Sequence, residues 1–198
     1  MSRPRGLRVI AGTARGRRLV APEGDQVRPT KDIAREAMFS ALDARGALDD
    51  ANVLDLYAGT GALAIEALSR GAASAVLVES DRSALAAIRS NLQVLESGTD
   101  LLAAGAAAEV VARDVGLFLT AAPPASAPFD LVFVDPPYET PDEVISEQLG
   151  KLAAPGWLAP GAIVSVERPR RHPVVPPPAL TSGWERTFGD TLLSFLFL

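Results

Sequence analysis

Apolar and polar positions alternate between two kinds of segment from residue 53 to residue 167, and this alternation predicts a sheet covered by helices. Five short apolar runs have the length and composition of buried strands: residues 53–57, 75–79, 109–112, 129–134 and 162–167. Four segments between them have helical character: residues 62–70, 81–95, 115–121 and 141–152. Strands that alternate with helices in this way form a mostly parallel sheet with helices on both faces.

The two ends of the chain predict antiparallel elements. Residues 7–10 and 17–20 enclose a glycine turn and predict a small β-hairpin outside the main core. Residues 184–188 and 191–198 enclose Gly189-Asp190 and predict a terminal hairpin, which follows an exposed, proline-rich connection. The antiparallel terminal hairpin extends the parallel sheet to a predicted seven strands.

Two units follow from this pattern. Residues 1–28 are expected to form a basic N-terminal hairpin arm, and residues 29–198 a single α/β domain of the Rossmann-like class. The length of 198 residues and a hydrophobic share of 48% suit one well-filled core. A helix from Thr30 to about Ala44 precedes the first strand and has one apolar face that can pack on the sheet.

Charge is distributed unevenly along the chain. The whole chain has a net charge of -5, but residues 1–31 hold eight basic and two acidic side chains, which leaves the rest strongly acidic. A basic arm on an acidic body favours contact with a phosphate backbone over the alternative of a solvated arm that only aids solubility. Arg35 lies near the start of the first helix and is either an anion ligand or ordinary surface charge. The residues expected to contact RNA are Arg8, Arg15, Arg17, Arg18, Arg28 and Lys31.

Composition excludes several kinds of chemistry. The chain has no cysteine, which rules out disulfides, thiolate nucleophiles and cysteine-bound metals, and its one histidine, His172, leaves little for a metal site. We therefore expect no metal. No apolar run approaches the roughly 18 to 20 residues of a membrane span, and no apolar signal region follows the arginine-rich start. These features lead us to expect a cytoplasmic monomer that does not interact with membranes.

A glycine turn follows the strand at residues 53–57. The segment Leu54 to Gly61 (LDLYAGTG) allows close approach of backbone to a ligand, with a helix N-terminus beside it. Glu79 ends the next strand, where a carboxylate can bind both hydroxyls of an adenosine ribose, and Asp114 after the third strand can reach the adenine amino group. The residues predicted to bind an adenosine cofactor are Asp55, Tyr57, Gly59, Thr60, Gly61, Glu79, Ser80 and Asp114.

Two adenosine cofactors fit this turn. The spacing Gly59-x-Gly61-x-x-Ala64 also satisfies the looser dinucleotide fingerprint, so the glycines alone do not separate a nicotinamide cofactor from S-adenosylmethionine. Asp55, four residues before Gly59, gives the D-x-x-x-G-x-G spacing typical of methyltransferases, whose cofactor has a cationic amino acid end. The alternative for Asp55 is a carboxylate that only caps local backbone.

Asp135-Pro136-Pro137-Tyr138 directly follows the apolar run at residues 129–134. Rigid prolines between a carboxylate and an aromatic ring make a fixed polar ledge beside a flat face. Asp135 and the carbonyl of Pro136 can each accept one hydrogen of an exocyclic base amine while Tyr138 stacks on the base, so that the nitrogen can attack a sulfonium methyl. We predict that these four residues are catalytic. The structural alternative is a proline turn that merely follows a strand.

Other stretches accompany these motifs: Arg28-Pro29-Thr30, Ala34 to Phe39 (AREAMF), Leu54 to Ala72 (LDLYAGTGALAIEALSRGA), Val78 to Asp81 (VESD), Asn91-Leu92 and Phe129 to Tyr138 (FDLVFVDPPY). In this combination the chain resembles the bacterial 16S ribosomal RNA guanine-N2 methyltransferases of the RsmD type over nearly its whole length. The resemblance implies S-adenosylmethionine as donor, one guanine of small-subunit 16S rRNA as target, and binding to an assembled particle. The chain departs from the family pattern at Thr60, Ala64 and Phe188, where serine, glycine and tyrosine are common.

Other functions share parts of this pattern. Amino methyltransferases of DNA adenine or cytosine and of protein glutamine have the same D-P-P-Y motif. The basic arm disfavours a protein target, and the chain is too short to include a large DNA-recognition domain. A nicotinamide dehydrogenase leaves the segment from Asp135 to Tyr138 unexplained. An RNA-binding module with an inactive cleft predicts affinity for RNA without affinity for the methyl donor.

Overall fold

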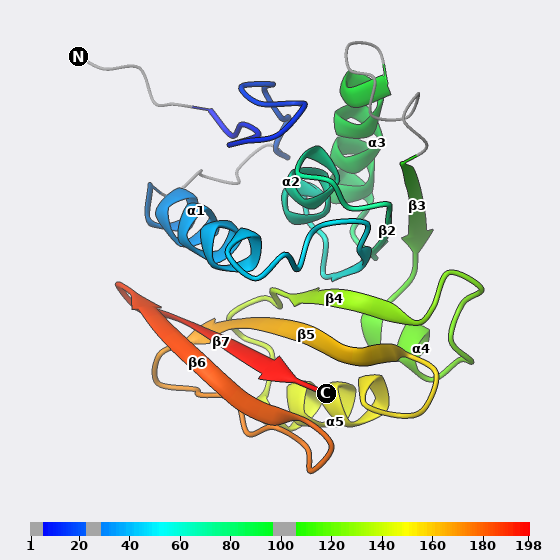
Figure 1. The fold of residues 1–198 in the computed structure, drawn as a ribbon, viewed down its shortest axis with the longest axis vertical. Coiled ribbons are helices and arrows are strands. Elements are labelled where there is room, and N and C mark those ends of the chain that lie inside the picture. Colours follow the sequence, from blue (N-terminus) through cyan, green and yellow to red (C-terminus); the bar gives the residue numbers. More distant parts are fainter. Residues whose placement is uncertain (1–5, 23–28, 97–105) are drawn as a thin grey trace.

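The computed structural model describes residues 6–22, 29–96 and 106–198. Its strands form one seven-stranded sheet in the order β3-β2-β1-β4-β5-β7-β6 (Figure 1). The strands are β1 (Asn52–Leu56), β2 (Ser74–Glu79), β3 (Ala107–Ala112), β4 (Phe129–Val134), β5 (Leu158–Pro169), β6 (Thr181–Phe188) and β7 (Thr191–Phe197). The helices are α1 (Pro29–Asp43), α2 (Ala62–Ser69), α3 (Arg82–Glu96), α4 (Val115–Leu119) and α5 (Asp142–Leu152).

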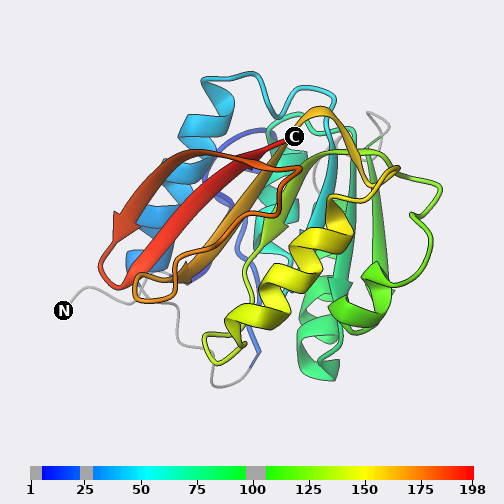
Figure 2. The ribbon, with the colours of Figure 1, turned by 90° about the horizontal axis from the view of Figure 1, so that it is seen from below.

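The strand pairing confirms the predicted mostly parallel sheet. Strands β1 to β5 pair in parallel, β7 is antiparallel to β5, and β6 is antiparallel to β7 at the edge of the sheet (Figure 2). The chain moves outward from β1 through β2 to β3 and then returns to place β4 on the other side of β1. Ligands of open α/β sheets bind where the strand order reverses in this way, outside the carboxyl ends of the strands. Here that point lies between β1 and β4.

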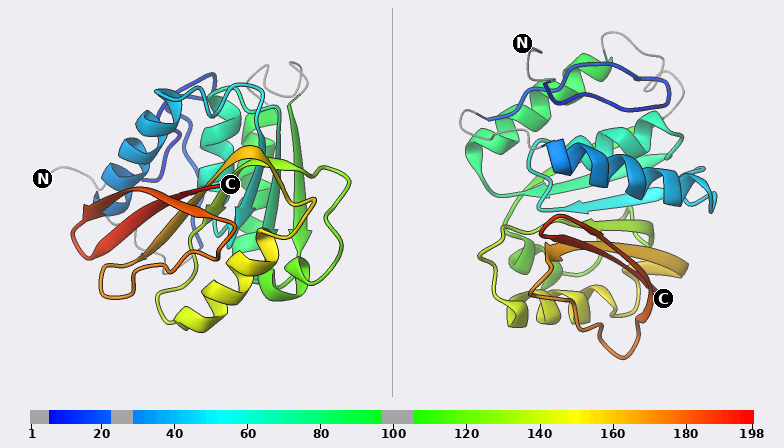
Figure 3. Two further views of the ribbon diagram at one scale, coloured as in Figure 1. Left: turned by 60° about the horizontal axis from the view of Figure 1, so that its bottom comes forward. Right: turned by 90° about the vertical axis from the view of Figure 1, so that its left-hand side faces the viewer.

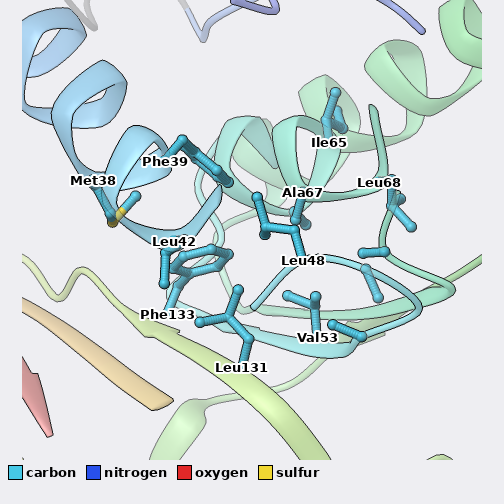
Figure 4. Packing of buried hydrophobic residues seen from close by; sticks show 14 of the residues in the cluster. Met38, Phe39, Leu42, Leu48, Val53, Ile65, Ala67, Leu68, Leu131 and Phe133 are labelled. Atoms are coloured by element: carbon cyan, nitrogen blue, oxygen red, sulfur yellow. The ribbon is translucent and has the colours of Figure 1, made fainter. Parts of the chain in front are cut away.

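Alternation along the strands divides the core between two faces of the sheet. Helices α1, α2 and α3 cover one face and α4 and α5 the other (Figure 1). On β4, Leu131 and Phe133 belong to the cluster under α1 and α2, whereas Val132 and Val134 belong to the cluster under α4 and α5. Figure 4 shows α1 side chains packed toward Leu131 and Phe133. The period of two residues places alternate positions of every central strand on the α1 side. The same period therefore sets the side of the sheet toward which each polar side chain at a strand end points.

The N-terminal hairpin differs from its prediction. Instead of two strands, residues 6–22 have a single antiparallel bridge, between Arg8 and Arg18. The prediction that it lies outside the main core is wrong, because Val9, Ala14 and Leu19 are buried in the same cluster as α2. In Figure 3 (right) the blue hairpin lies beside the green α2 and α3. Its arginines are exposed or half-buried, whereas the apolar side chains between them pack on the domain.

Buried polar side chains fix the hairpin to the domain. Glu66, with no exposed surface, accepts hydrogen bonds from the backbone N–H groups of Ile10 (2.6 Å) and Ala11 (2.9 Å). Asn91, also fully buried, accepts from the N–H of Val20 (2.7 Å) and donates to the carbonyl of Thr60 (2.9 Å). Asn91 thus links the end of the hairpin to the glycine turn after β1.

Replacing Glu66 with glutamine is expected to destabilise the fold. The carboxylate also accepts from Arg70 at 2.7 Å, and an amide of the same shape turns an N–H₂ group toward at least one of these donors. We expect a loss of about 2 to 3 kcal/mol in the free energy of unfolding, measured by urea titration. The matched control is Glu36→Gln on exposed α1 surface, which is expected to leave the unfolding midpoint unchanged. Equal midpoints for the two variants would contradict the anchoring role of Glu66.

Strand β5 is longer than predicted. It runs from Leu158 to Pro169, with prolines near both ends and a register shift against β4 between Phe129 and Leu131. The sequence pattern identified only its apolar centre, because Pro160 and Gly161 interrupt the run. Within the described part of the chain, no helix combines the length and apolar character needed to cross a membrane.

Candidate active site

A cleft of about 860 Å³ opens at the carboxyl ends of the central strands, beside the point where the strand order reverses. It is lined by residues of both predicted groups. From the cofactor group come Asp55, Tyr57, Gly59, Thr60, Glu79, Ser80 and Asp114. From the catalytic group come Asp135, Pro136, Pro137 and Tyr138. The glycine turn and the D-P-P-Y segment, 74 residues apart from Gly61 to Asp135, therefore share one cavity.

Gly61 is the one predicted cofactor residue that does not line the cleft. It begins α2 in a left-handed conformation, with φ of 75°, and a Cβ atom there would lie 3.0 Å from Cδ2 of Leu77. Its role in the structure is therefore to turn the chain into α2 and to let that helix pack closely on β2. Tyr57 also has a positive φ, of 63°, which is uncommon outside glycine, and its hydroxyl donates to Oε1 of Gln148 at 2.6 Å.

Asp55 is buried at the centre of the cleft, with 1% of its surface exposed. Its Oδ2 accepts a hydrogen bond from the N–H of Ala64 at the start of α2 (3.1 Å), while Oδ1 has no hydrogen-bond partner among the described residues. Burial raises the pKa of Asp55 to about 8; the bond from Ala64 opposes this shift, and the carboxylates of Asp135 and Glu79 add to it. A buried acceptor without a donor costs free energy that a cationic ligand can recover.

Glu79 is held at the rim of the cleft by backbone groups. Its Oε2 accepts from the N–H of Gly59 (2.8 Å), and its Oε1 accepts from the N–H groups of Ser80 (2.7 Å) and Asp81 (2.8 Å). The carboxylate therefore ties the end of β2 to the glycine turn. Asp114 caps α4 by accepting from the N–H of Leu117 at 3.0 Å. Both acidic groups lie at strand ends, as the sequence predicted for a nucleoside site.

Tyr138 reaches across the ends of two strands. Its hydroxyl lies 3.1 Å from Oγ1 of Thr191, the first residue of β7, although Tyr138 itself follows β4. Strand β5 lies between these two in the sheet, so the tyrosine side chain spans the end of β5. Sequence reasoning missed Thr191, since only the folded topology places β7 beside β5 and within reach of a side chain that follows β4.

A second missed group fixes the segment that follows Tyr138. Arg168, 2% exposed on β5, donates from Nη2 to the carbonyl of Thr140 (2.8 Å) and to Oδ1 of Asp142 (2.7 Å). His172 completes the group with Nδ1 at 2.8 Å from Oδ2 of Asp142. Hydrogen bonds from His172 and then from Arg168 lower the pKa of Asp142. His172 thus has a structural contact at the exposed rim, within the stretch predicted as a proline-rich connection.

The cleft is strongly acidic. Among the described residues that line it, six are acidic and one, Arg35, is basic. The acidic residues are Asp55, Glu79, Asp81, Asp114, Asp135 and Glu167. A pyrophosphate would be repelled by this set, whereas a ligand with a sulfonium and an ammonium group would be attracted. The charge of the cleft therefore separates the two cofactors that the glycine spacing left open.

The predicted RNA-contacting arginines of residues 6–22 lie outside the cleft. Arg8, Arg15 and Arg18 are exposed on the hairpin and Arg17 is half-buried, while Leu7 and Ala21 of the same segment line the cleft. The hairpin therefore borders the opening, with its basic side chains turned to solvent. Two of the predicted RNA contacts fall outside the description: the residue Arg28 and the side chain of Lys31.

Comparison with known proteins places the chain among methyltransferase relatives. The model of the family described as "Conserved hypothetical protein 95" matches residues 7–197. The chain belongs to this family. Among curated proteins, Ribosomal RNA small subunit methyltransferase D of Escherichia coli is 38% identical over 161 residues, which is 81% of this chain and 74% of that protein. The protein of the same name from Haemophilus influenzae is 33% identical over 184 residues, 92% of this chain and 89% of that protein.

Solved structures of similar proteins agree with the Conserved hypothetical protein 95 assignment. A putative methyltransferase from Escherichia coli has a TM-score of 0.80 and 32% identity, covering 96% of this chain and 97% of the other. A magnesium protoporphyrin IX methyltransferase from Synechocystis, solved with bound S-adenosylmethionine, has a TM-score of 0.61 at 17% identity, and that likeness concerns the fold alone. The predicted Rossmann-like class I methyltransferase fold is confirmed.

Proposed function

We propose that this chain transfers a methyl group from S-adenosylmethionine to the exocyclic N2 amine of a guanine in small-subunit 16S rRNA. The observation that carries the proposal is the single acidic cleft that contains both the unpartnered Oδ1 of Asp55 and the Asp135–Tyr138 segment. The names of the Escherichia coli and Haemophilus influenzae relatives support ribosomal RNA of the small subunit as the substrate.

The donor fits the half of the cleft formed by β1, β2 and β3. Glu79 would bind the ribose hydroxyls, Asp114 the adenine amino group, and Asp55 the ammonium group of the methionine end. Ionised Asp55 would then gain the donor that its Oδ1 lacks, so cofactor binding would lower the pKa of a carboxyl that burial has raised. These assignments use the positions of the three acidic groups at successive strand ends.

The acceptor amine fits the other half, at the end of β4. Asp135 and the carbonyl of Pro136 would each accept one N–H, while Tyr138 stacks on the base and keeps it in the plane that these acceptors require. The nitrogen lone pair forms the new N–C bond as the S–C bond breaks and its electrons return to sulfur. The methylated nitrogen then loses one proton to Asp135 or to water. A base inside a helix cannot reach this position, so the guanine has to leave its stack.

The test measures methyl transfer directly. Small subunits and naked 16S rRNA from cells that lack this activity are incubated with the protein and donor labelled in the methyl group, and the product nucleoside is identified after nuclease digestion. We expect labelled N2-methylguanosine at one position, with assembled subunits as the better substrate. Label on adenine or cytosine, or affinity for RNA without affinity for the donor, would contradict the proposal. A preference for naked RNA would overturn only the assembled-particle part of it.

The hairpin supplies a separate prediction. Reversing Arg15 and Arg18 to glutamate is expected to raise the KM for rRNA by about tenfold or more and to reduce the salt dependence of log KM by roughly two units of slope. The matched control reverses Arg89 and Arg113, which are also exposed but lie on α3 and directly after β3. Both variants are assayed across a salt series. An equal effect of the two double reversals on KM would show that only the net charge of the protein matters, and would contradict a specific contact between the hairpin and rRNA.

A further inference from the structure

The cleft is lined by one acidic residue from each of four neighbouring strands. In sheet order these are Glu79 at the end of β2, Asp55 on β1, Asp135 after β4 and Glu167 on β5. The first three have roles in the proposed reaction, with the cofactor or with the reacting amine. Glu167 has none, although it lines the same cleft.

The position of Glu167 is set by the register of the sheet. Val134 of β4 pairs with Val166 of β5, so Glu167 follows on the strand next to Asp135, about 5 Å away in backbone spacing. Ser165 points to the α1 side, where its hydroxyl contacts Sδ of Met38 at 3.2 Å. Two residues further on, Glu167 returns to the same side, which is the side of the cleft. The carboxylate therefore lies beside Asp135, on the part of the rim away from the donor.

Tyr138 brings the acceptor base to the same place. Because its hydroxyl is held at Thr191 on β7, a base stacked on its ring would lie over the end of β5, where Glu167 stands. Arg35 lines the cleft from α1, the helix whose Phe39 packs against Phe133 of β4. It is 8% exposed, and its Nη2 donates to the carbonyl of Arg8 at 2.8 Å, which fixes the guanidinium in place.

These two groups match the edge of guanine that carries the reacting amine. Guanine presents N2–H and N1–H donors side by side, followed by the O6 acceptor. Adenine and cytosine present a lone pair on the ring nitrogen next to their amine. A carboxylate accepts from a ring N–H and repels a lone pair, and a guanidinium donates to O6.

We propose that Glu167 selects guanine by accepting the N1–H hydrogen bond while the N2 amine lies at Asp135, and that Arg35 donates to O6. This inference rests on the proposed function and names the groups that would recognise its base. If Glu167 and Arg35 only held α1 and β5 together, replacing either residue would slow methylation of every base by the same factor. If they recognise guanine, the loss depends on the base.

The decisive comparison uses 2-aminopurine, which keeps the reacting amine but has a lone pair at N1 and no O6. It replaces the methylated guanine, once mapped, in ligated 16S rRNA reconstituted into subunits. The wild-type protein is expected to lose about 10³-fold or more in kcat/KM on this substitution, as sites built to hydrogen-bond a base do when the partner is missing. Failure of the wild type to methylate the guanine-containing subunit would refute the proposed function itself.

The same pair of substrates then tests Glu167→Gln. Glutamine can turn its N–H₂ group to the N1 lone pair of 2-aminopurine, so kcat/KM is expected to fall about 100-fold for guanine but to hold or rise for the analogue. The preference for guanine should therefore narrow by about 100-fold. Arg35→Met is expected to narrow it too, because the analogue has no O6 to lose.

Two controls separate recognition from folding. Affinity for S-adenosylhomocysteine, measured by calorimetry, should be unchanged in Glu167→Gln, and Glu143→Gln, at an exposed carboxylate in the first turn of α5, should leave both the rates and the preference as in the wild type. Equal slowing of guanine and 2-aminopurine by Glu167→Gln would overturn the proposal for Glu167. Equal slowing of the two substrates by Arg35→Met would show that Arg35 only contacts the hairpin, and would overturn the proposal that it donates to O6.

Discussion

Replacing Asp135 with alanine is expected to lower kcat by about 10³-fold while changing the affinity for S-adenosylhomocysteine by less than about threefold. The residue lies at the end of β4, where its carboxylate is half-buried and close enough to Asp55 to raise that group's pKa. It would hold one hydrogen of the reacting amine, an interaction that strengthens as positive charge develops on nitrogen. Loss of such an interaction appears in the chemical step, so single-turnover rates measure it.

Tyr138→Phe is the matched control for this variant. It keeps the ring that would stack on the base and removes the hydroxyl that contacts Thr191. We expect a fall in kcat of less than about tenfold. If Asp135→Ala retained nearly full turnover, the amine would not depend on this carboxylate, and the proposed chemistry at the end of β4 would be wrong.

Asp55→Asn is expected to have opposite effects on stability and on donor binding. The wild-type carboxyl has a pKa of about 8 in the folded protein against 3.8 as its ordinary value. Its folded form therefore holds a proton that the unfolded chain has lost between these two values. The stability it contributes is fully present below pH 3.8 and declines as pH rises toward 8, by about 1.4 kcal/mol per pH unit. Asparagine does not titrate and lacks this decline.

Urea unfolding of the ligand-free protein between pH 5 and pH 8 tests the stability half of this prediction. The variant should become progressively more stable than the wild type as pH rises, while at pH 8 its affinity for S-adenosylmethionine falls by about 10- to 100-fold because the ammonium loses its carboxylate. Calorimetry measures the second effect. A variant that is less stable than the wild type at pH 8 would contradict the destabilising ionisation of Asp55. A variant that binds the donor as tightly as the wild type would contradict its contact with the ammonium group.

The sequence was sufficient for the elements that have strong local signals. Flanking glycine or proline marks the buried strands β1, β2 and β4. Glu79 follows from its spacing to the glycine turn, and Asp114 from its place after the third strand. Those residues line the cleft because parallel strands end on the same side of a sheet. The same spacing assigns Gly61 to the ligand; Gly61 does not line the cleft, and a Cβ atom at this position would lie 3.0 Å from Cδ2 of Leu77.

The residues that sequence reasoning missed depend on the order of the strands. Glu167 follows an apolar run with no motif around it, and it lines the cleft because β5 lies beside β4. Thr191 is one polar residue at the start of a strand, and it contacts Tyr138 because β7 lies beside β5. Arg168 sits against a proline-rich stretch that indicated exposure, yet it is buried. The hairpin was placed outside the core for a similar reason. Its many arginines concealed the three apolar side chains that anchor it.

The acidic lining of the cleft has a consequence for the fate of the by-product. S-adenosylmethionine carries one net positive charge, and the reaction removes that charge because the sulfonium becomes a neutral thioether. The six acidic residues that line the cleft attract the cationic donor more strongly than the by-product, which keeps the ammonium group but has lost the sulfonium charge. Turnover therefore weakens the hold of the cleft on what it has just produced. We expect relief from product inhibition to be built into the same electrostatics that recruit the substrate.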